Sequence, residues 1–343
     1  MASVFTTFAL IVLGGVVRVT GSGLGCGGEW PLCEGSLIPP LTKEDIIEYS
    51  HRLVASAIVG PLILITFLLA VIRYRKVRSV IIPSTAAVVM LLAQGGLGGV
   101  TVLTELPGHV VAAHLALAQA LFGCLILVAV AAYRVRTPQM VSGAGEQDTG
   151  LMPSEAPAAE SGEEPTTRTR SGGFPRLAAF AAVATYVMLL SGAYVTATPG
   201  ALAACPQWPL CGGNLWPSTE LQFIHMLHRV VAALVGIVII YTMFRAFKFG
   251  IERISSGGMA ILLLSGFASA FFLTQVIIGA AAIWSDFPVT LRAYHIALAT
   301  AVWGTMAAVA LLSNFKVDNS GVVIREVLRV DGEGPAAAPA GTP

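Results

Sequence analysis

The sequence predicts an all-α integral membrane protein whose eight transmembrane helices form two tandem four-helix bundles related by a pseudo-twofold axis. Three observations support this fold class. Hydrophobic residues make up 55% of the 343 residues and charged residues only 11%, which is too little charge to cover a soluble protein of this size. Apolar runs of about 17 to 25 residues, long enough to cross a bilayer as helix, occur eight times. The second half of the chain also repeats motifs of the first.

Each apolar run predicts one helix. Alternating strands of about 10 residues, as in membrane β-barrels, do not occur, so helices are the remaining way to satisfy backbone groups in lipid. The run at the N-terminus lacks a basic segment and a small-residue cleavage pattern, which favours a retained helix over a signal peptide. The predicted spans are 2–18, 53–72, 80–103, 110–132, 176–196, 223–244, 258–284 and 291–313.

Basic residues predict the orientation because short loops rich in Lys and Arg stay cytoplasmic. Such residues follow the second, fourth, sixth and eighth spans, whereas the opposite loops hold only scattered positive charges. Both termini are therefore expected in the cytoplasm and loops 19–50 and 197–222 outside. The richness in Ala and Arg, with only four lysines, is typical of a GC-rich bacterial genome, so the membrane is expected to be that of a bacterial cell. The formal net charge of +1 gives no reason to expect nucleic-acid binding.

The two halves match at offsets of 177 to 181 positions. Each half has four spans, an even number, so both copies would insert with the same orientation. The matched segments are Leu13-Gly14-Gly15 with Leu190-Ser191-Gly192, Trp30-Pro31-Leu32-Cys33 with Trp208-Pro209-Leu210-Cys211, Gln94 with Gln275, Pro107 with Pro288, and His114 with His295.

The repeat predicts an N-terminal four-helix bundle over 1–136 and a C-terminal four-helix bundle over 175–315. Between them, 137–174 is dense in Gly, Ser, Pro, Thr and Glu without an apolar period, which predicts a disordered cytoplasmic linker. The segment 316–343 is expected to be a disordered cytoplasmic tail.

Four of the five cysteines lie in the two predicted external loops as Cys26 with Cys33 and Cys205 with Cys211. Closely spaced thiols outside the cytoplasm predict one disulfide in each loop. Structural zinc is the alternative, but it takes four ligands, and each loop offers two thiols and no nearby imidazole. A redox role of the first pair stays open.

Four histidines lie at or just inside the external ends of spans two, four, six and eight. A lone membrane histidine is more often a packing or hydrogen-bonding residue, but four at equivalent positions of a duplicated bundle favour ligation. Imidazole is a common axial ligand of haem iron, and bundles build cofactor sites from neighbouring helices. A metal ion bound directly by two imidazoles is a poorer alternative. The pairs predicted to bind haem are His51 with His114 and His228 with His295.

Glu48 distinguishes the two sites. It precedes His51 by three residues and would share its helical face, whereas His225 takes the matching position in the second half. The difference indicates that one site holds a cofactor and the other a substrate. Arg52 and Arg229 each follow a histidine, either as anchors at the membrane interface or as partners of haem propionates.

These residues together resemble the haem A synthase family, cytochrome oxidase assembly proteins that oxidise haem O. The resemblance implies conversion of a haem O methyl group to the formyl group of haem A through hydroxylated intermediates. It implies haem b as the cofactor, substrate in the first half, Glu48 as the catalytic residue, and electron or haem transfer at the first cysteine pair. The motifs concerned are Glu48-x-x-His51-Arg52, Cys26 and Cys33, His114, Cys205 and Cys211, His228-Arg229 and His295, with His228 and His295 implied as haem b ligands and His51 and His114 as substrate ligands.

Haem O, membrane lipid, the haem O synthase and an electron-transfer protein are the partners expected, and an oligomer is left open. The alternatives are a di-haem b membrane electron-transfer cytochrome and a haem transporter or chaperone. Cytochromes that carry electrons across a bilayer place haems toward opposite faces. Here all four histidines lie at one face on four helices, and Glu48 has no use in pure electron transfer.

Overall fold

The computed structural model describes residues 1–36, 42–136, 173–214, 216–252, 254 and 258–314. The predicted linker lies outside these residues except for Gly173 and Phe174, at which α6 begins, and the predicted tail lies wholly outside them. Regular structure in the described ranges is helical apart from two isolated bridges, Cys33–Ser36 and Cys211–Asn214.

Eight helical segments of the described chain are long and apolar enough to cross a membrane, so the predicted all-α membrane fold is confirmed. Every predicted span lies inside an observed segment. The segments are α1 (Ala2–Thr20), α2 (Lys43–Val54) continued by a π-helical turn (Ala55–Val59) and α3 (Gly60–Tyr74), α4 (Arg78–Leu103), α5 (Gly108–Arg136), α6 (Phe174–Ala197), α7 (Glu220–Ile251), α8 (Gly258–Trp284) and α9 (Val289–Asn314).

The second segment starts ten residues before its predicted span, at Lys43 instead of position 53. Thr42 caps α2 by accepting a hydrogen bond from the Asp45 amide at 3.3 Å, and the acidic first turn suits the positive end of the helix dipole. One helix therefore carries both Glu48 and His51, as the spacing predicts.

A π-helical turn joins α2 to α3. In it the Gly60 amide donates to the carbonyl of Ala55, five residues earlier. Pro61 follows, has no amide hydrogen and would clash with the carbonyl four residues before it in a regular helix, which the wider turn avoids. The matching α7 runs without such a turn.

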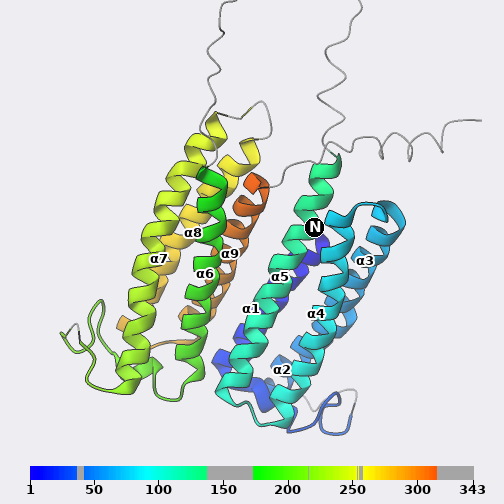
Figure 1. Ribbon diagram of the computed structural model, residues 1–343. Coiled ribbons are helices and arrows are strands. Elements are labelled where there is room, and N and C mark those ends of the chain that lie inside the picture. Colours follow the sequence, from blue (N-terminus) through cyan, green and yellow to red (C-terminus); the bar gives the residue numbers. More distant parts are fainter. Residues whose placement is uncertain (37–41, 137–172, 215, 253, 255–257, 315–343) are drawn as a thin grey trace, which may run out of the picture.

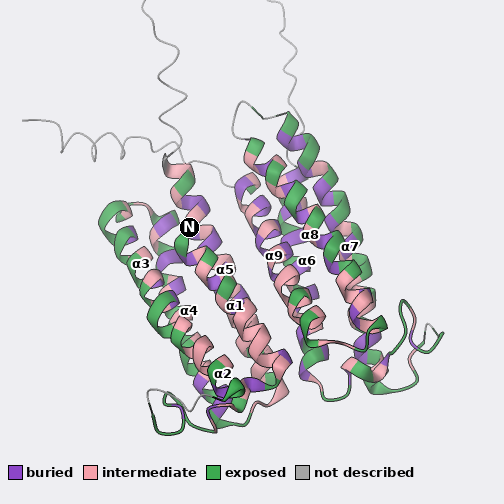
Figure 2. Cartoon of the chain, turned by 180° about the vertical axis from the view of Figure 1, so that it is seen from behind, coloured by how far each residue is buried: buried purple, intermediate pink, exposed green. Residues whose placement is uncertain are grey.

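The helices form two groups that stand side by side, α1 to α5 in one and α6 to α9 in the other (Figure 1). Contact between the groups runs through α5 against α6 and α9, and through α1 against α9. Figure 2 shows exposed residues along the outer helices α3 and α7, where large apolar side chains such as Leu68 and Ile237 face outward. Such surfaces suit contact with lipid.

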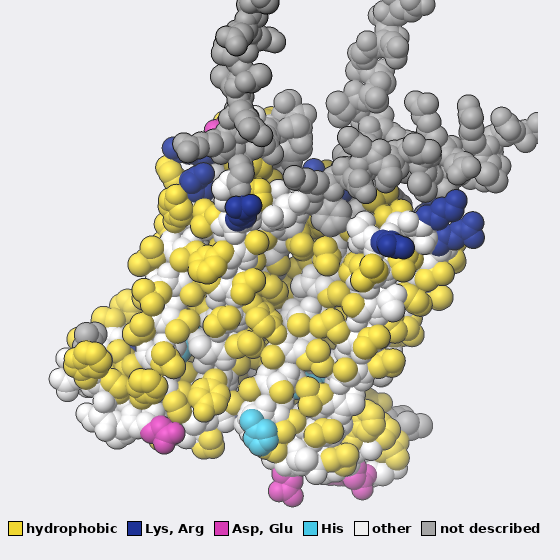
Figure 3. All heavy atoms as spheres, in the orientation of Figure 1, with side chains coloured by type: hydrophobic (Ala, Val, Ile, Leu, Met, Phe, Trp, Pro, Cys, Tyr) yellow, Lys and Arg dark blue, Asp and Glu magenta, His cyan; other side chains and the backbone are white. Residues whose placement is uncertain are grey.

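The face in Figure 3 is largely hydrophobic between two charged ends. Lys and Arg side chains gather toward the end where α1 begins, and Asp and Glu lie at the opposite end (Figure 3). This polarity matches the distribution of basic residues along the sequence.

Polar contacts fasten α5 to α9. Gln119 and Thr300 are 1% and 0% exposed, and the Gln119 amide donates to Thr300 Oγ1 at 2.8 Å. Trp303 Nε1 donates to the main-chain oxygen of Gln119 at 3.1 Å. A Cβ at Gly123 would come within 3.0 Å of the Trp303 ring, and one at Gly304 within 2.7 Å of the Phe122 ring. On each of the two helices, a glycine therefore lies in contact with an aromatic ring of the other helix.

Candidate functional site

Each half brings two of the four predicted histidines together from different helices. His51 of α2 lies within electrostatic range of His114 of α5, and His228 of α7 within that of His295 of α9. The fold thus brings each expected pair near one another, and their role as haem ligands stays a prediction.

Every one of these imidazoles lies against a glycine of a neighbouring helix. A Cβ would be 3.0 Å from His51 Nε2 at Gly14, 3.2 Å from His114 Cε1 at Gly98, 2.9 Å from His228 Cε1 at Gly192 and 3.0 Å from His295 Cε1 at Gly279. A methyl group at Gly192 would require the ring to shift, and one at any of the other three glycines would be tighter than most Cβ contacts, so glycine at these positions lets the ring lie close to the neighbouring helix.

The alignment of α1 with α6 was off by one residue for these contacts. It paired Gly14 with Ser191, whereas Gly192 faces His228 as Gly14 faces His51. Ser191 instead has its hydroxyl 2.8 Å from His228 Nδ1. A hydroxyl on the remote ring nitrogen orients a ligating histidine, because it fixes the ring rotation.

The residue types of these pairs fit a haem. A porphyrin supplies four ligands to its iron and leaves room for up to two from the protein, and each half offers two imidazoles. Within the described ranges no group of three or more His, Cys, Asp and Glu could hold a metal ion directly. The buried Nδ1 atoms of His114 and His295 have no hydrogen-bond partner.

Glu48 is 4% exposed and both of its oxygens have partners. Its Oε2 accepts from the Cys26 amide at 2.9 Å, and its Oε1 accepts from Nε and Nη2 of Arg52 at 3.1 and 2.5 Å. The carboxylate therefore joins α2, which carries His51, to the first residue of the disulfide loop.

Arg52 holds that loop as well. The loop is closed by the predicted disulfide between Cys26 and Cys33, with an S–S distance of 2.02 Å. Arg52 Nη1 donates to three of its main-chain oxygens, those of Glu29 at 3.0 Å, Pro31 at 3.4 Å and Leu32 at 2.8 Å.

Arg229 repeats this contact in the second half, where the predicted disulfide Cys205–Cys211 is also formed at 2.03 Å. The sequence offered membrane anchoring or propionate binding for both arginines, and no reasoning from the sequence suggested this loop contact. The sequence feature that could have indicated this contact is the Trp-Pro-Leu-Cys segment that precedes a His-Arg pair in each half. The oxygens that accept from Arg229 belong to Gln207 at 2.7 Å, Pro209 at 3.1 Å, Leu210 at 3.1 Å and Cys205 at 2.9 Å.

His225 replaces Glu48 as the partner of its arginine. Its Nδ1 lies 3.0 Å from the carbonyl oxygen of Ala201, which can only accept, so Nδ1 carries the proton. Its Nε2 is then free to accept from Arg229 Nη2 at 3.3 Å. The first site has an ion pair where the second has a neutral acceptor.

Trp30 and Gln94 add to the first site. The Trp30 ring, from the disulfide loop, would lie 3.1 Å from a Cβ at Gly99, next to the Gly98 that faces His114. The amide nitrogen of Gln94 lies 3.1 Å from His114 Nε2. Neither residue was among the site residues predicted from the sequence.

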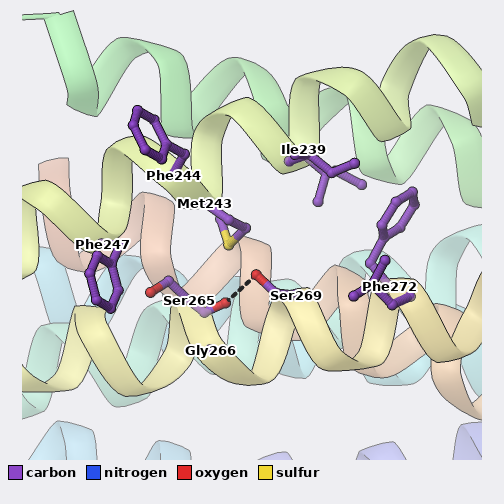
Figure 4. A pocket seen from close by; sticks show the side chains of 10 residues that line it. Ile239, Met243, Phe244, Phe247, Ser265, Gly266, Ser269 and Phe272 are labelled. Atoms are coloured by element: carbon purple, nitrogen blue, oxygen red, sulfur yellow. Dashed lines mark hydrogen bonds between the residues drawn. The ribbon is translucent and has the colours of Figure 1, made fainter.

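A cavity of about 370 Å³ lies away from the histidines, between α7 and α8 (Figure 4). Apolar side chains including Phe244, Phe247 and Phe272 line it, and the hydroxyl of Ser269 donates to the carbonyl oxygen of Ser265 at 2.9 Å beside it. No predicted site residue borders this cavity.

Proteins with established names are similar in sequence to this chain over both of its halves. The family described as cytochrome oxidase assembly protein matches residues 1–307. The haem A synthase of Bacillus pumilus is 28% identical over 329 residues, which cover 93% of this chain and 96% of that protein. The haem A synthase of Symbiobacterium thermophilum is 30% identical over 320 residues, which cover 91% of this chain and 94% of that protein. The haem A synthase of Alkalihalophilus pseudofirmus is 31% identical over 247 residues, which cover 70% of this chain and 74% of that protein. The matched region contains all four histidines, both disulfides and Glu48, and the chain belongs to the cytochrome oxidase assembly protein family that includes the haem A synthases.

Proposed function

We propose that this protein is a haem A synthase, an oxidoreductase that converts a methyl group of haem O to the formyl group of haem A through hydroxylated intermediates. The observation that carries the proposal is the pair of histidine sites of matching build with a carboxylate, Glu48, at only one of them. Two equivalent electron-transfer sites would have no need of that difference. The family and the named relatives support the same reaction.

The two sites would divide the work between halves 1–136 and 175–315. His228 and His295 would hold haem b, and the Ser191 hydroxyl at His228 Nδ1 suits a cofactor that stays in place. His51 and His114 would hold haem O. Bound haem supplies the redox chemistry, and the protein supplies placement.

Glu48 would act on the substrate as a fixed carboxylate. The Cys26 amide and Arg52 hold it in one orientation through charge-assisted hydrogen bonds. Each carboxylate oxygen has more than one lone pair, so the group can still accept a proton or face a developing positive charge. Its position on α2, one turn before His51, places it beside the proposed substrate ligand.

The orientation follows from the charges at the two ends. The Lys- and Arg-rich end of Figure 3 would face the cytoplasm, with the disulfide loops and both sites toward the outer side of a bacterial cell membrane. A disulfide in each loop suits an oxidising compartment. Haem O synthase and an electron-transfer protein would be the partners on this side or within the membrane.

The test is to purify the protein from a host that makes haem O and to identify the extracted haems by mass. We expect haem A or its hydroxylated precursor. Haem B as the sole haem would contradict the synthase and favour an electron-transfer cytochrome.

Two variants assign the roles. Glu48→Gln should stop product formation while haem b stays bound, because His228 and His295, the proposed ligands of haem b, lie in the other half. His228→Ala should instead lose the absorption of haem b. Full turnover by Glu48→Gln would remove Glu48 from the reaction.

A further inference from the structure

The tautomer of His114 follows from the two contacts that the side-chain amide of Gln94 makes with this residue. Gln94 Nε2 lies 3.1 Å from the main-chain oxygen of His114 and 3.1 Å from its ring Nε2. A carbonyl oxygen can only accept, so the group that faces it is the NH2 group of Gln94 and not its oxygen. The same NH2 group therefore donates to the ring, and His114 Nε2 presents its lone pair.

This lone pair is the one that an iron atom would need. In a neutral imidazole with an acceptor at Nε2, the proton lies on Nδ1, and Nδ1 of His114 is buried without a partner. Only Nε2 can then coordinate iron. One lone pair serves one donor, so iron binding to His114 must displace the Gln94 N–H.

The second half contains no such competitor at its matching position. Gln275 of α8 aligns with Gln94, and the side-chain oxygens of both residues are buried without a hydrogen-bond partner. The two residues differ in the other half of the amide: among the hydrogen bonds of the described ranges, none joins the side-chain NH2 group of Gln275 to the ring of His295, which is hydrogen-bonded to the main chain of Gln275 instead. The other ligand of that half, His228, is held instead through its remote nitrogen by Ser191.

We propose that Gln94 is a positioning residue that makes His114 the exchangeable ligand of the substrate haem, by competing with iron for the Nε2 lone pair. The inference rests on the proposed function, in which the first half takes the substrate. When the iron–nitrogen bond breaks, its electron pair returns to Nε2 and accepts the Gln94 N–H, so nothing is oxidised or reduced. A substrate haem must enter the first half and a product must leave it, whereas a cofactor stays in the second half. The side-chain amide contacts the histidine ring only in the half that is proposed to exchange its haem.

The test is a titration of the purified protein, with its resident haem bound, with ferric protohaem. Absorption and electron paramagnetic resonance distinguish six-coordinate low-spin from five-coordinate high-spin iron. Gln94→Leu removes the donor and should bind the added haem more tightly and in low-spin form, by roughly tenfold for one hydrogen bond.

Gln94→Glu should act in the opposite direction. A carboxylate can only accept, so it draws the ring proton to Nε2, removes the lone pair and leaves the added haem weakly bound and high-spin. Loss of packing would shift both variants the same way, so opposite shifts identify competition for the lone pair.

Two controls complete the design. Gln275→Leu, the matched change in α8, should leave the titration of the added haem unaltered, and His114→Ala should abolish its low-spin form in every background. Unchanged affinity and spin state in Gln94→Leu, or shifts of the same sign in both Gln94 variants, would overturn the inference alone. Failure of every variant to take up added haem would overturn the substrate-site assignment as well.

Discussion

Gly279 admits the ring of His295, and a methyl group there would be 3.0 Å from Cε1. We expect Gly279→Ala to push the imidazole from its position and to weaken haem b binding roughly tenfold, in line with about 1 to 3 kcal/mol for an overpacked site. The measurement is haem absorbance per polypeptide after purification. Gly266→Ala is the matched control on the same helix, since nothing lies within 4 Å of its Cβ position. Equal loss of haem in both variants would contradict the role of Gly279.

Single residues could be predicted from the sequence where their chemistry is local. The four histidines and the two cysteine pairs stand out because imidazoles in apolar runs and closely spaced thiols are rare without a reason. The glycines opposite the histidines could not be assigned, since each contact joins two helices whose rotation the sequence leaves open. A shift of one residue between Ser191 and Gly192 was enough to misplace one of them.

Helix α2 and its disulfide loop are joined by Arg52, and α7 and its loop by Arg229. Arg52→Ala would leave the buried Glu48 carboxylate without its counter-charge, which costs about 3 to 5 kcal/mol. Arg229→Ala removes the partner of His225, which is neutral, so this variant should lose less stability than Arg52→Ala. Thermal unfolding in detergent measures both, and Arg52→Ala combined with Glu48→Gln should recover part of the difference. An equal loss in the two single variants would show that the ion pair adds nothing to the loop contacts.

The elements themselves were predictable because lipid selects long apolar helices, and run length is visible in the sequence. The start of α2 was not, because residues 43–52 are mostly polar and do not continue the apolar run, and two of them, Glu48 and Arg52, bond to the disulfide loop. The cap at Thr42 and the following Glu44 and Asp45 were the available signals for that start.

The two halves of the molecule meet at Gln119 of α5 and Thr300 of α9. Thr300→Val removes the acceptor of a buried amide and should lower the free energy of unfolding by about 1 to 3 kcal/mol. Unfolding in detergent checks this value. The double variant Gln119→Leu with Thr300→Val should cost less than the sum of the single changes, because it leaves no unpaired group. Additive losses would mean that the two side chains do not depend on each other.

How the two halves pack could not be predicted from the sequence. Internal similarity predicts two bundles but does not say which helices join them, because every helix carries enough apolar surface to do so. The duplication itself stays a prediction, with matching contacts in its favour: a glycine at every histidine, an arginine on each loop, and the rings of Phe122 and Trp303 set against glycines of opposite helices.

The π-helical turn changes the offset at which the two halves of the chain align. His51 and His228 are 177 positions apart, whereas Ile63 and Ile239, 1% and 0% exposed, are 176 positions apart. The wide turn lies between His51 and Ile63, and because a π-helical turn holds one residue more than a regular one, it would account for the difference if Ile63 is aligned with Ile239 of the regular helix α7. If the halves share an ancestor, a single insertion or deletion separates them here, and the helix accommodated it in one turn without moving the imidazole on one side or the buried isoleucine on the other.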